Sequence, residues 1–180
     1  MKRNLIAGVV VLVALAALSW AQDRNQPSPR SVERITREVR HELLMLPYFT
    51  VFDSISYKVD GSNVTLMGAV VNPTVKSDAG NVVKKIEGVE GVDNQIEVLP
   101  PSPMDDGLRR RLFRAIYGYP ALQKYDLGVQ KPIRIIVKSG RVSLEGVVDN
   151  EQDKNLAGVR ANGVSGIFSV TNNLQVVPSK

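Results

Sequence analysis

VTLMGAVVN, residues 64–72, recurs 78 residues further along the chain as VSLEGVVDN, residues 142–150. The same offset continues without a gap and aligns further identical pairs, which are Lys76/Lys154, Ala79/Ala157, Gly80/Gly158, Gly88/Gly166, Val92/Val170, Asn94/Asn172, Val98/Val176 and Pro100/Pro178. Upstream, Pro47 aligns with Pro120, and Phe52-Asp53 with Tyr125-Asp126, at an offset of 73. The second copy therefore holds five extra residues, which we place within 128–132. The chain is a tandem duplication, and any structure assigned to one copy must fit the other.

Hydrophobic periodicity gives both copies the same order of elements. Each opens with apolar residues at helical spacing, over 32–46 or 108–119, and each helical pattern ends at a proline. An alternating hairpin follows, then a second helix that begins after an asparagine cap, and finally a closing strand over 92–98 or 170–177. We predict an α+β fold of two tandem αββαβ modules, each a three-stranded mixed sheet backed by two helices.

The predicted modules cover residues 31–100 and 105–178. A unit of about 70 residues is small for an independent hydrophobic core, so we expect the two modules to pack together. The chain has no cysteine, so no disulfide can support either core. Gly68 and Gly146, in the middle of the repeated strand, are interpreted as structural, because a strand glycine usually marks a bulge or a close backbone approach.

The amino terminus has the pattern of an export signal. Lys2 and Arg3 precede an uncharged apolar run over 5–18 and a small-x-small sequence that ends at Ala21. This pattern predicts a cleavable signal peptide over residues 1–21 and a polar linker over 22–30, with an uncleaved membrane anchor as the alternative. Either outcome places the folded body outside the cytoplasm, and the predicted location is the periplasm.

The paired αββαβ units, the V-x-L-x-G-x-V strand in both copies and the predicted signal peptide resemble the BON domain family. The resemblance covers about residues 31–178. It implies a non-enzymatic protein of the periplasm or outer membrane, linked to envelope integrity and osmotic stress, that binds phospholipid surfaces. It implies no catalytic residues.

Charge is unevenly divided between the copies. Residues 31–100 carry 7 basic and 10 acidic side chains, whereas residues 101–180 carry 12 basic and 7 acidic ones. The first helix of the second copy concentrates arginines and aromatic residues, and the predicted lipid-binding residues are Arg109, Arg110, Arg111, Arg114, Phe113 and Tyr117.

A helical projection places these residues relative to the core. Leu108, Leu112, Ala115, Ile116 and Tyr119 are expected to face the core, which leaves Arg110, Arg114 and Tyr117 outward with Phe113 at the flank. Guanidinium groups beside aromatic rings suit the phosphates of an anionic phospholipid headgroup layer.

Other interpretations of the same helix remain open. It is also consistent with a solvated face, or with a face packed against the first module. A protein interaction scaffold, in which the αββαβ modules oligomerise or bind envelope proteins, is the alternative function. Nucleic acid is not expected as a partner, because the protein is predicted to be exported and no recognition motif accompanies the arginines.

The residues that could support catalysis are few. His41 is the one histidine and is expected on a helix surface without catalytic or zinc-binding partners. Asp149, Glu151 and Asp153 resemble the start of a calcium loop, but the sequence lacks its glycine and terminal glutamate, so we interpret them as a helix cap. Asp105-Asp106 likewise suits a helix start. We predict no catalytic residue, no metal site and no cofactor.

Overall fold

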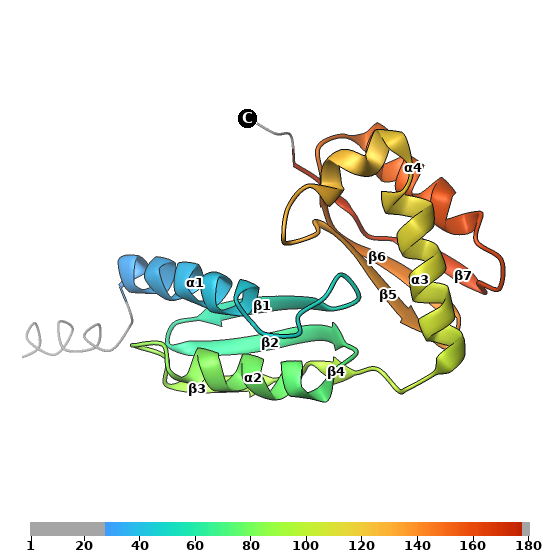
Figure 1. The fold of residues 1–180 in the computed structure, drawn as a ribbon. Coiled ribbons are helices and arrows are strands. Elements are labelled where there is room, and N and C mark those ends of the chain that lie inside the picture. The colour runs from blue at the N-terminus through green and yellow to red at the C-terminus, as the bar shows by residue number, and fades with distance from the viewer. Residues whose placement is uncertain (1–27, 178–180) are drawn as a thin grey trace, which may run out of the picture.

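The computed structural model describes residues 28–177, which form two αββαβ modules in tandem (Figure 1). The predicted signal peptide lies outside the described residues, as does most of the predicted linker. The first helix begins at Pro29 with Ser28 as its N-cap, so Pro29 and Arg30 belong to this helix rather than to a linker. Within residues 28–177, no helix is both long and apolar enough to cross a membrane.

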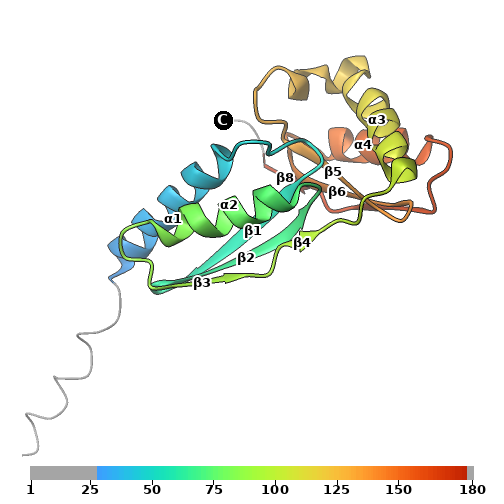
Figure 2. The ribbon, with the colours of Figure 1, turned by 60° about the horizontal axis from the view of Figure 1, so that its bottom comes forward.

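The first module has its two helices on one face of its sheet, as Figure 2 shows. Its elements are α1 (Pro29–Leu44), β1 (Ser54–Asp60), β2 (Asn63–Val70), α2 (Pro73–Lys84), β3 (Gly91–Asn94) and β4 (Glu97–Val98). β2 pairs antiparallel with β1 and parallel with β3 and β4, so β2 is the central strand. The core lies between the sheet and the helices and includes Ile35, Val39, Leu66, Val75 and Val83, each at most 1% exposed.

The second module repeats this arrangement and adds a 3₁₀ helix. Its elements are α3 (Pro103–Tyr117), η1 (Pro120–Asp126), β5 (Ile133–Lys138), β6 (Arg141–Val148), α4 (Glu151–Asn162), β7 (Ser169–Asn172) and β8 (Gln175–Val176). Ile55 pairs with Gly68, and Ile133 pairs with Gly146, so the two hairpins match at the 78-residue offset. The extra residues of the second copy therefore fall between η1 and β5. The predicted α+β fold of two mixed sheets is confirmed.

The closing strand of each module is broken, whereas the periodicity predicted a continuous one. The Asn94 side-chain amide donates to the carbonyl of Lys76 in α2 at 2.8 Å, and its side-chain oxygen accepts from the Ile96 N–H at 3.3 Å. Asn172 makes the equivalent bonds in the second module. A Cβ at Gly80 would lie 2.9 Å from the Asn94 amide nitrogen, which explains why glycine and asparagine recur together in both copies.

The glycines of the repeated motif allow a carbonyl of the preceding segment to approach the central strand. Gly68 and Gly146 have φ angles of +120° and +104°. A Cβ at Gly68 would lie 2.1 Å from the Ser54 carbonyl oxygen, and one at Gly146 would lie 2.0 Å from that of Pro132. No side chain fits at that distance, so both the space and the backbone conformation require glycine.

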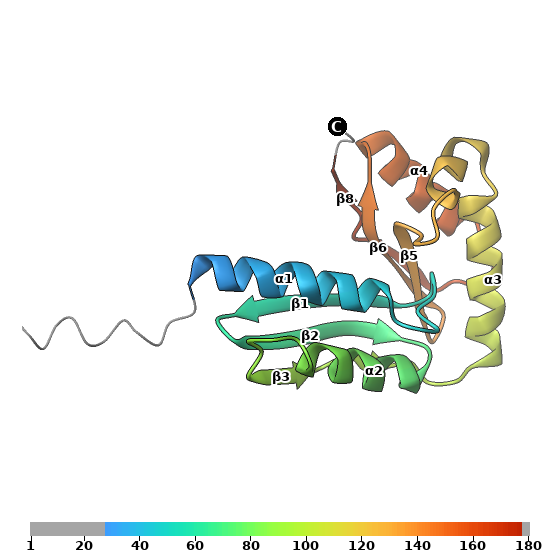
Figure 3. The same ribbon diagram turned by 60° about the vertical axis from the view of Figure 1, so that its left-hand side comes forward.

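The modules pack together through the loop between α1 and β1, as expected from their small size. The N–H of Ile135 on β5 donates to the Val51 carbonyl at 2.9 Å, and Val51 and Phe52 pack against the second core. Phe52 meets Phe113 of α3 edge to face, with ring centroids 6.5 Å apart. Figure 3 shows the strands of the two sheets running crosswise to each other.

A polar cluster joins η1 to the start of α4. The Lys124 amine lies 2.9 Å from Asp149 and 2.7 Å from Asp153, and the Tyr125 hydroxyl donates to Asp153 at 2.6 Å. Burial raises the pKa of the Asp153 carboxyl, but hydrogen bonds from Lys124, Tyr125 and Asn150 outweigh burial and leave this pKa below its usual value. Asn150 is the N-cap of α4 and accepts from the Asp153 N–H at 2.8 Å, in agreement with the predicted capping role.

Replacing Gly68 by alanine is expected to lower the free energy of unfolding by about 2–4 kcal/mol, because the new Cβ collides with the Ser54 carbonyl and the backbone is strained. Gly146→Ala should cost a similar amount. Gly107→Ala in α3 is the control, since its Cβ meets only the end of the Arg111 side chain, and we expect no loss. Urea unfolding measures all three, and an unchanged midpoint for Gly68→Ala would contradict this account.

Asp153 is expected to make the second module sensitive to acid. A carboxyl with a lowered pKa stabilises the fold above its unfolded-state pKa, about 3.9, and this stability is lost as the pH falls through the folded value. Asp153→Asn should therefore cost about 1.5–3 kcal/mol at pH 7 and progressively less toward pH 2. Thermal unfolding across this pH range tests the effect. Glu151→Gln, on the exposed side of the same helix turn, should not reproduce this pH dependence.

Candidate functional site

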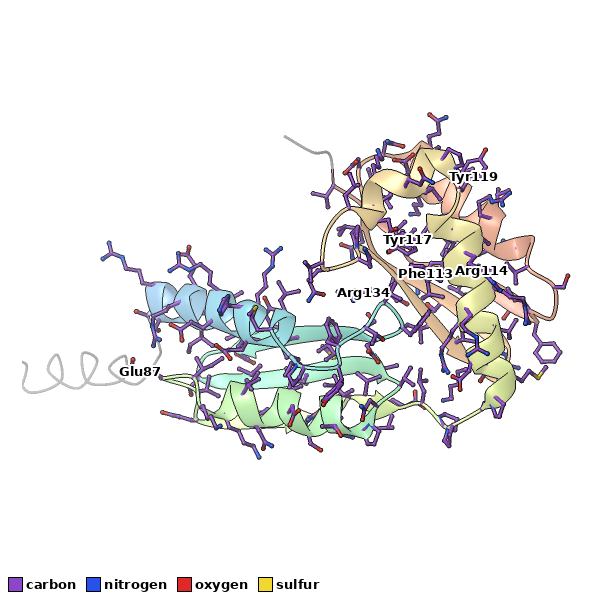
Figure 4. All side chains as sticks on the ribbon, in the orientation of Figure 1. Glu87, Phe113, Arg114, Tyr117, Tyr119 and Arg134 are labelled. Carbon is purple, nitrogen blue, oxygen red and sulfur yellow. The ribbon has the colours of Figure 1, made fainter. Side chains whose placement is uncertain are left out.

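The outer face of α3 carries three exposed arginines. Arg110, Arg111 and Arg114 are all exposed, and Figure 4 shows Arg114 on α3 with Phe113 and Tyr117 nearby. The face begins about two turns after the start of α3. At that start, Ser102 caps the helix by accepting from the Asp105 N–H at 3.2 Å. Three of the four arginines that the sequence singled out are therefore exposed along α3, although the Arg111 guanidinium is directed to the Ser165 carbonyl at 3.4 Å.

Arg109 is the exception, because the sequence analysis counted it among the lipid-binding residues, whereas the structure buries it. It is 3% exposed, because it lies on the side of α3 that faces the β5–β6 hairpin. Its guanidinium donates to the Val137 carbonyl at 2.7 Å and to the Asp106 carboxylate at 2.6 Å. One turn earlier, the Asp105 carboxylate accepts the N–H groups of the hairpin turn at 2.8 and 2.9 Å. These groups attach α3 to its sheet and are not available to a partner.

Tyr117 is also buried, although the sequence placed it outward. It is 2% exposed, and its hydroxyl donates to the Ile133 carbonyl at 2.6 Å and accepts the Ile133 N–H at 3.1 Å. Burial raises the pKa of this hydroxyl well above its usual value. The helical projection failed for Tyr117 because it ignored β5, whose Ile133 backbone bonds the hydroxyl, and it failed for Tyr119 because α3 ends at Tyr117, with Gly118 as its C-cap. Tyr119 therefore no longer follows the helix and is only half-buried, with the Arg160 guanidinium 4.7 Å from its ring centroid.

Phe113 lies between two hollows along α3. It is half-buried, and its ring centroid lies 5.0 Å from that of Tyr117. On one side, Phe113 and Arg114 line a hollow of about 430 Å³ that Leu127 also lines. Toward the other end of the helix, Arg110 lines a second hollow of about 330 Å³ with residues of the first module. The arginines thus stand beside apolar surface rather than on an isolated helix face.

Leu127 extends this surface and Val129 follows it two residues later in the same loop, and the sequence analysis identified neither as functional. Leu127 and Val129 are 88% and 96% exposed and lie in the loop between η1 and β5. This loop has no counterpart in the first module. The sequence feature that could have identified them is the five-residue insertion in the second copy, because it brings large apolar residues into a loop, where polar residues are usual.

Arg110 and Arg114 form no ion pair with the described part of the chain. Asp106 pairs with the buried Arg109, and Asp126 pairs with Lys131 at 2.8 Å, so the nearest carboxylates are already engaged. Among the described residues, no carboxylate lies within 4 Å of the Arg110 or Arg114 guanidinium groups. By contrast, Arg34 of α1 pairs with a glutamate on its own helix at 2.9 Å. Arg110 and Arg114 are therefore available to attract an anion at the surface of α3.

The remaining polar candidates contribute no metal site. His41 is exposed on α1, as expected. Across residues 28–177, no three His, Cys, Asp or Glu side chains come together as they would around a metal ion.

Comparison with known proteins identifies the family. The BON domain model matches the chain over residues 31–100 and again over residues 119–178. The chain belongs to the BON domain family. Its second BON match begins at Tyr119, although α3 packs into the same module through Leu108, Leu112 and Ile116.

Two solved structures resemble this BON protein weakly. Both are of CdsD, a structural protein of the type III secretion system of Chlamydia trachomatis, and one of them is its C-terminal domain. The first is 12% identical, with a TM-score of 0.29, and the match covers 82% of this chain and 94% of that one. The C-terminal domain is 13% identical, with a TM-score of 0.28, and the match covers 79% and 96%. No curated protein matches the chain.

Proposed function

We propose that this chain is a non-enzymatic, exported BON protein of the bacterial envelope that binds anionic phospholipid surfaces through α3. One observation carries the proposal: Arg114, which has no carboxylate within 4 Å among the described residues, lines a hollow together with the exposed Leu127. Cations next to exposed apolar side chains suit a headgroup layer, where guanidinium groups contact phosphates and apolar side chains enter the acyl boundary. The family supports this partner class, and the signal-like residues 1–21 support a periplasmic location, where the protein would help to maintain the envelope under osmotic stress.

The expected binding is weak and reversible. Each basic residue near an anionic surface contributes about 1 kcal/mol, so three arginines supply about 3 kcal/mol. The two apolar side chains add a further contribution that is insensitive to salt. Salt screens the first part, because the Debye length falls from about 10 Å at 0.1 M to about 3 Å at 1 M.

Co-sedimentation of the purified protein with liposomes tests the proposal. We expect binding to phosphatidylglycerol liposomes at low salt, reduced binding at 1 M salt and little binding to phosphatidylcholine. Replacing Arg110, Arg111 and Arg114 by glutamate should abolish the binding, because the exposed charge reverses while the core is untouched.

The matched control reverses three exposed charges on the first module, with Arg37, Lys84 and Lys85 replaced by glutamate. It changes the net charge by the same amount, and we expect it to keep most of the binding. Equal loss in both variants would mean that only total charge matters. No binding of the unchanged protein to phosphatidylglycerol would refute the membrane proposal and favour the protein interaction scaffold.

The loop between η1 and β5 is expected to contribute the salt-insensitive part. Replacing Leu127 and Val129 together by serine should weaken binding to phosphatidylglycerol several-fold at high salt and less at low salt, because the arginines remain. The fold should be unaffected, since both side chains are almost fully exposed. Circular dichroism checks the fold. If the variant binds phosphatidylglycerol liposomes at high salt as well as the unchanged protein does, the loop does not contribute to the site.

A further inference from the structure

A second surface with an unpaired cation lies at the module junction, apart from the α3 face. A cleft of about 570 Å³ opens between α1, β1 and the start of β5. Its apolar wall includes Leu43, Leu44, Phe49, Ile55 and Val147, and its cations are Arg40, Lys131 and Arg134. No acidic side chain is among the described residues that line it.

Arg134 is held in place across the junction (Figure 4). Its guanidinium carbon lies 4.5 Å from the centroid of the Phe49 ring. The guanidinium donates to the Thr50 carbonyl at 2.9 Å and to the Gln130 side-chain oxygen at 3.0 Å. Gln130 in turn donates to the Leu44 carbonyl at 2.7 Å. A cation fixed by stacking and by neutral acceptors is already positioned for a ligand and loses little entropy on binding.

No carboxylate of the described part of the chain lies within 4 Å of the Arg134 guanidinium, although the charge of the buried Asp53 acts on it from farther away. Glu145 is its neighbour across the β5–β6 pair, but the Glu145 carboxylate is engaged by the hydroxyl of Ser143 and by the side-chain amide of Asn173. Burial lowers the pKa of Arg134, as expected for a cation partly removed from water. A bound anion would relieve this cost.

The other two cations differ in their availability. Lys131 pairs with Asp126 and donates to the carbonyls of Asp126 and Gly128, so its amine is engaged within its own loop. Arg40 is exposed, and no carboxylate of residues 28–177 lies within 4 Å of it. Two unpaired guanidinium groups, one from each module, therefore border an apolar wall.

We infer that this cleft binds one anionic amphiphile, with a phosphate or carboxylate head between Arg134 and Arg40 and an apolar chain along Leu43, Phe49 and Ile55. Apolar walls between the cations favour a hydrocarbon chain over an acidic peptide, whose backbone would need polar partners. The site is separate from the α3 surface and binds a single molecule rather than a membrane.

Isothermal titration of the purified protein with dodecyl phosphate, below its critical micelle concentration, tests the inference. Inorganic phosphate has the head alone and dodecyl maltoside has the chain with a neutral head, and each should bind at least about ten-fold more weakly. If inorganic phosphate binds as tightly, the apolar wall does not contribute to binding. If the maltoside binds as tightly, the cations do not contribute. Tighter binding of a hexaglutamate peptide would overturn the inference in favour of an acidic protein partner.

Substitutions locate the site. Arg40→Gln and Arg134→Gln should each weaken dodecyl phosphate binding about ten-fold or more, the expected loss for one charge-assisted contact. Arg40 makes no contact that supports the fold, so its variant is informative even if Arg134→Gln disturbs the junction. Arg37→Gln, one turn away on the same helix, is the control and should bind like the unchanged protein. Unchanged affinity in Arg40→Gln and Arg134→Gln would refute the inference.

Two further variants separate this site from its neighbours. Glu145→Gln should bind as tightly as the unchanged protein, because Glu145 is engaged by Ser143 and Asn173, and clearly tighter binding would contradict the description of Arg134 as unpaired. The α3 variant with glutamate at Arg110, Arg111 and Arg114 should lose liposome binding yet keep dodecyl phosphate binding. Loss of both would assign the amphiphile to α3 and overturn the separate site.

Discussion

The hydrogen bond from the Ile135 N–H to the Val51 carbonyl, at 2.9 Å, decides how the two halves of the molecule meet. Ile135 lies on the edge strand of the second sheet, where an unpaired backbone group would otherwise be open to another chain. The loop that supplies Val51 is ordered by Asp53, whose carboxylate accepts from the N–H of Thr50 and the N–H of Val71, both at 2.7 Å. This loop also places Phe52 against α3 and Phe49 beneath Arg134, so both proposed sites depend on it.

The two modules use different side chains to bond the backbone N–H that follows the central strand. The N–H that follows the central strand is bonded to the Asp53 carboxylate in the first module and to the Tyr125 hydroxyl in the second. Tyr125 brings a neutral hydroxyl to this position and then requires Asp153 and Lys124 to complete its hydrogen bonds. The two side chains are not aligned, since Asp53 corresponds to Asp126 and Tyr125 to Phe52, so each module satisfies this N–H from a different position of its loop.

The fold could be predicted because each assignment had to fit both copies of the duplication. The hydrophobic periodicity and the residues that bound the helices and strands agree in the two copies. Errors arose where a local interaction outweighed periodicity. The Asn94 side chain breaks a strand whose apolar alternation predicted a continuous one. Contacts with β5 bury Tyr117 on the side of α3 that the projection placed outward, and α3 ends before Tyr119. Arg109 was grouped with the lipid-binding arginines by its sequence position alone, but it is buried, and the Val137 carbonyl and the Asp106 carboxylate accept its hydrogen bonds.

The candidate sites were harder to predict because they depend on contacts between the copies, which no repeat period encodes. The arginines of α3 stood out in the sequence by their number. Leu127 became a candidate only when the structure placed it in the same hollow as Arg114. Arg134 carries even less sequence signal, since its strand neighbour Glu145 suggests an ordinary cross-strand ion pair. That pair is absent because Glu145 bonds to Asn173, while Arg134 turns to Thr50 of the other module. An arginine that stabilises the junction through neutral carbonyls keeps its full charge, and such a charge at the edge of an apolar cleft attracts anions with apolar chains.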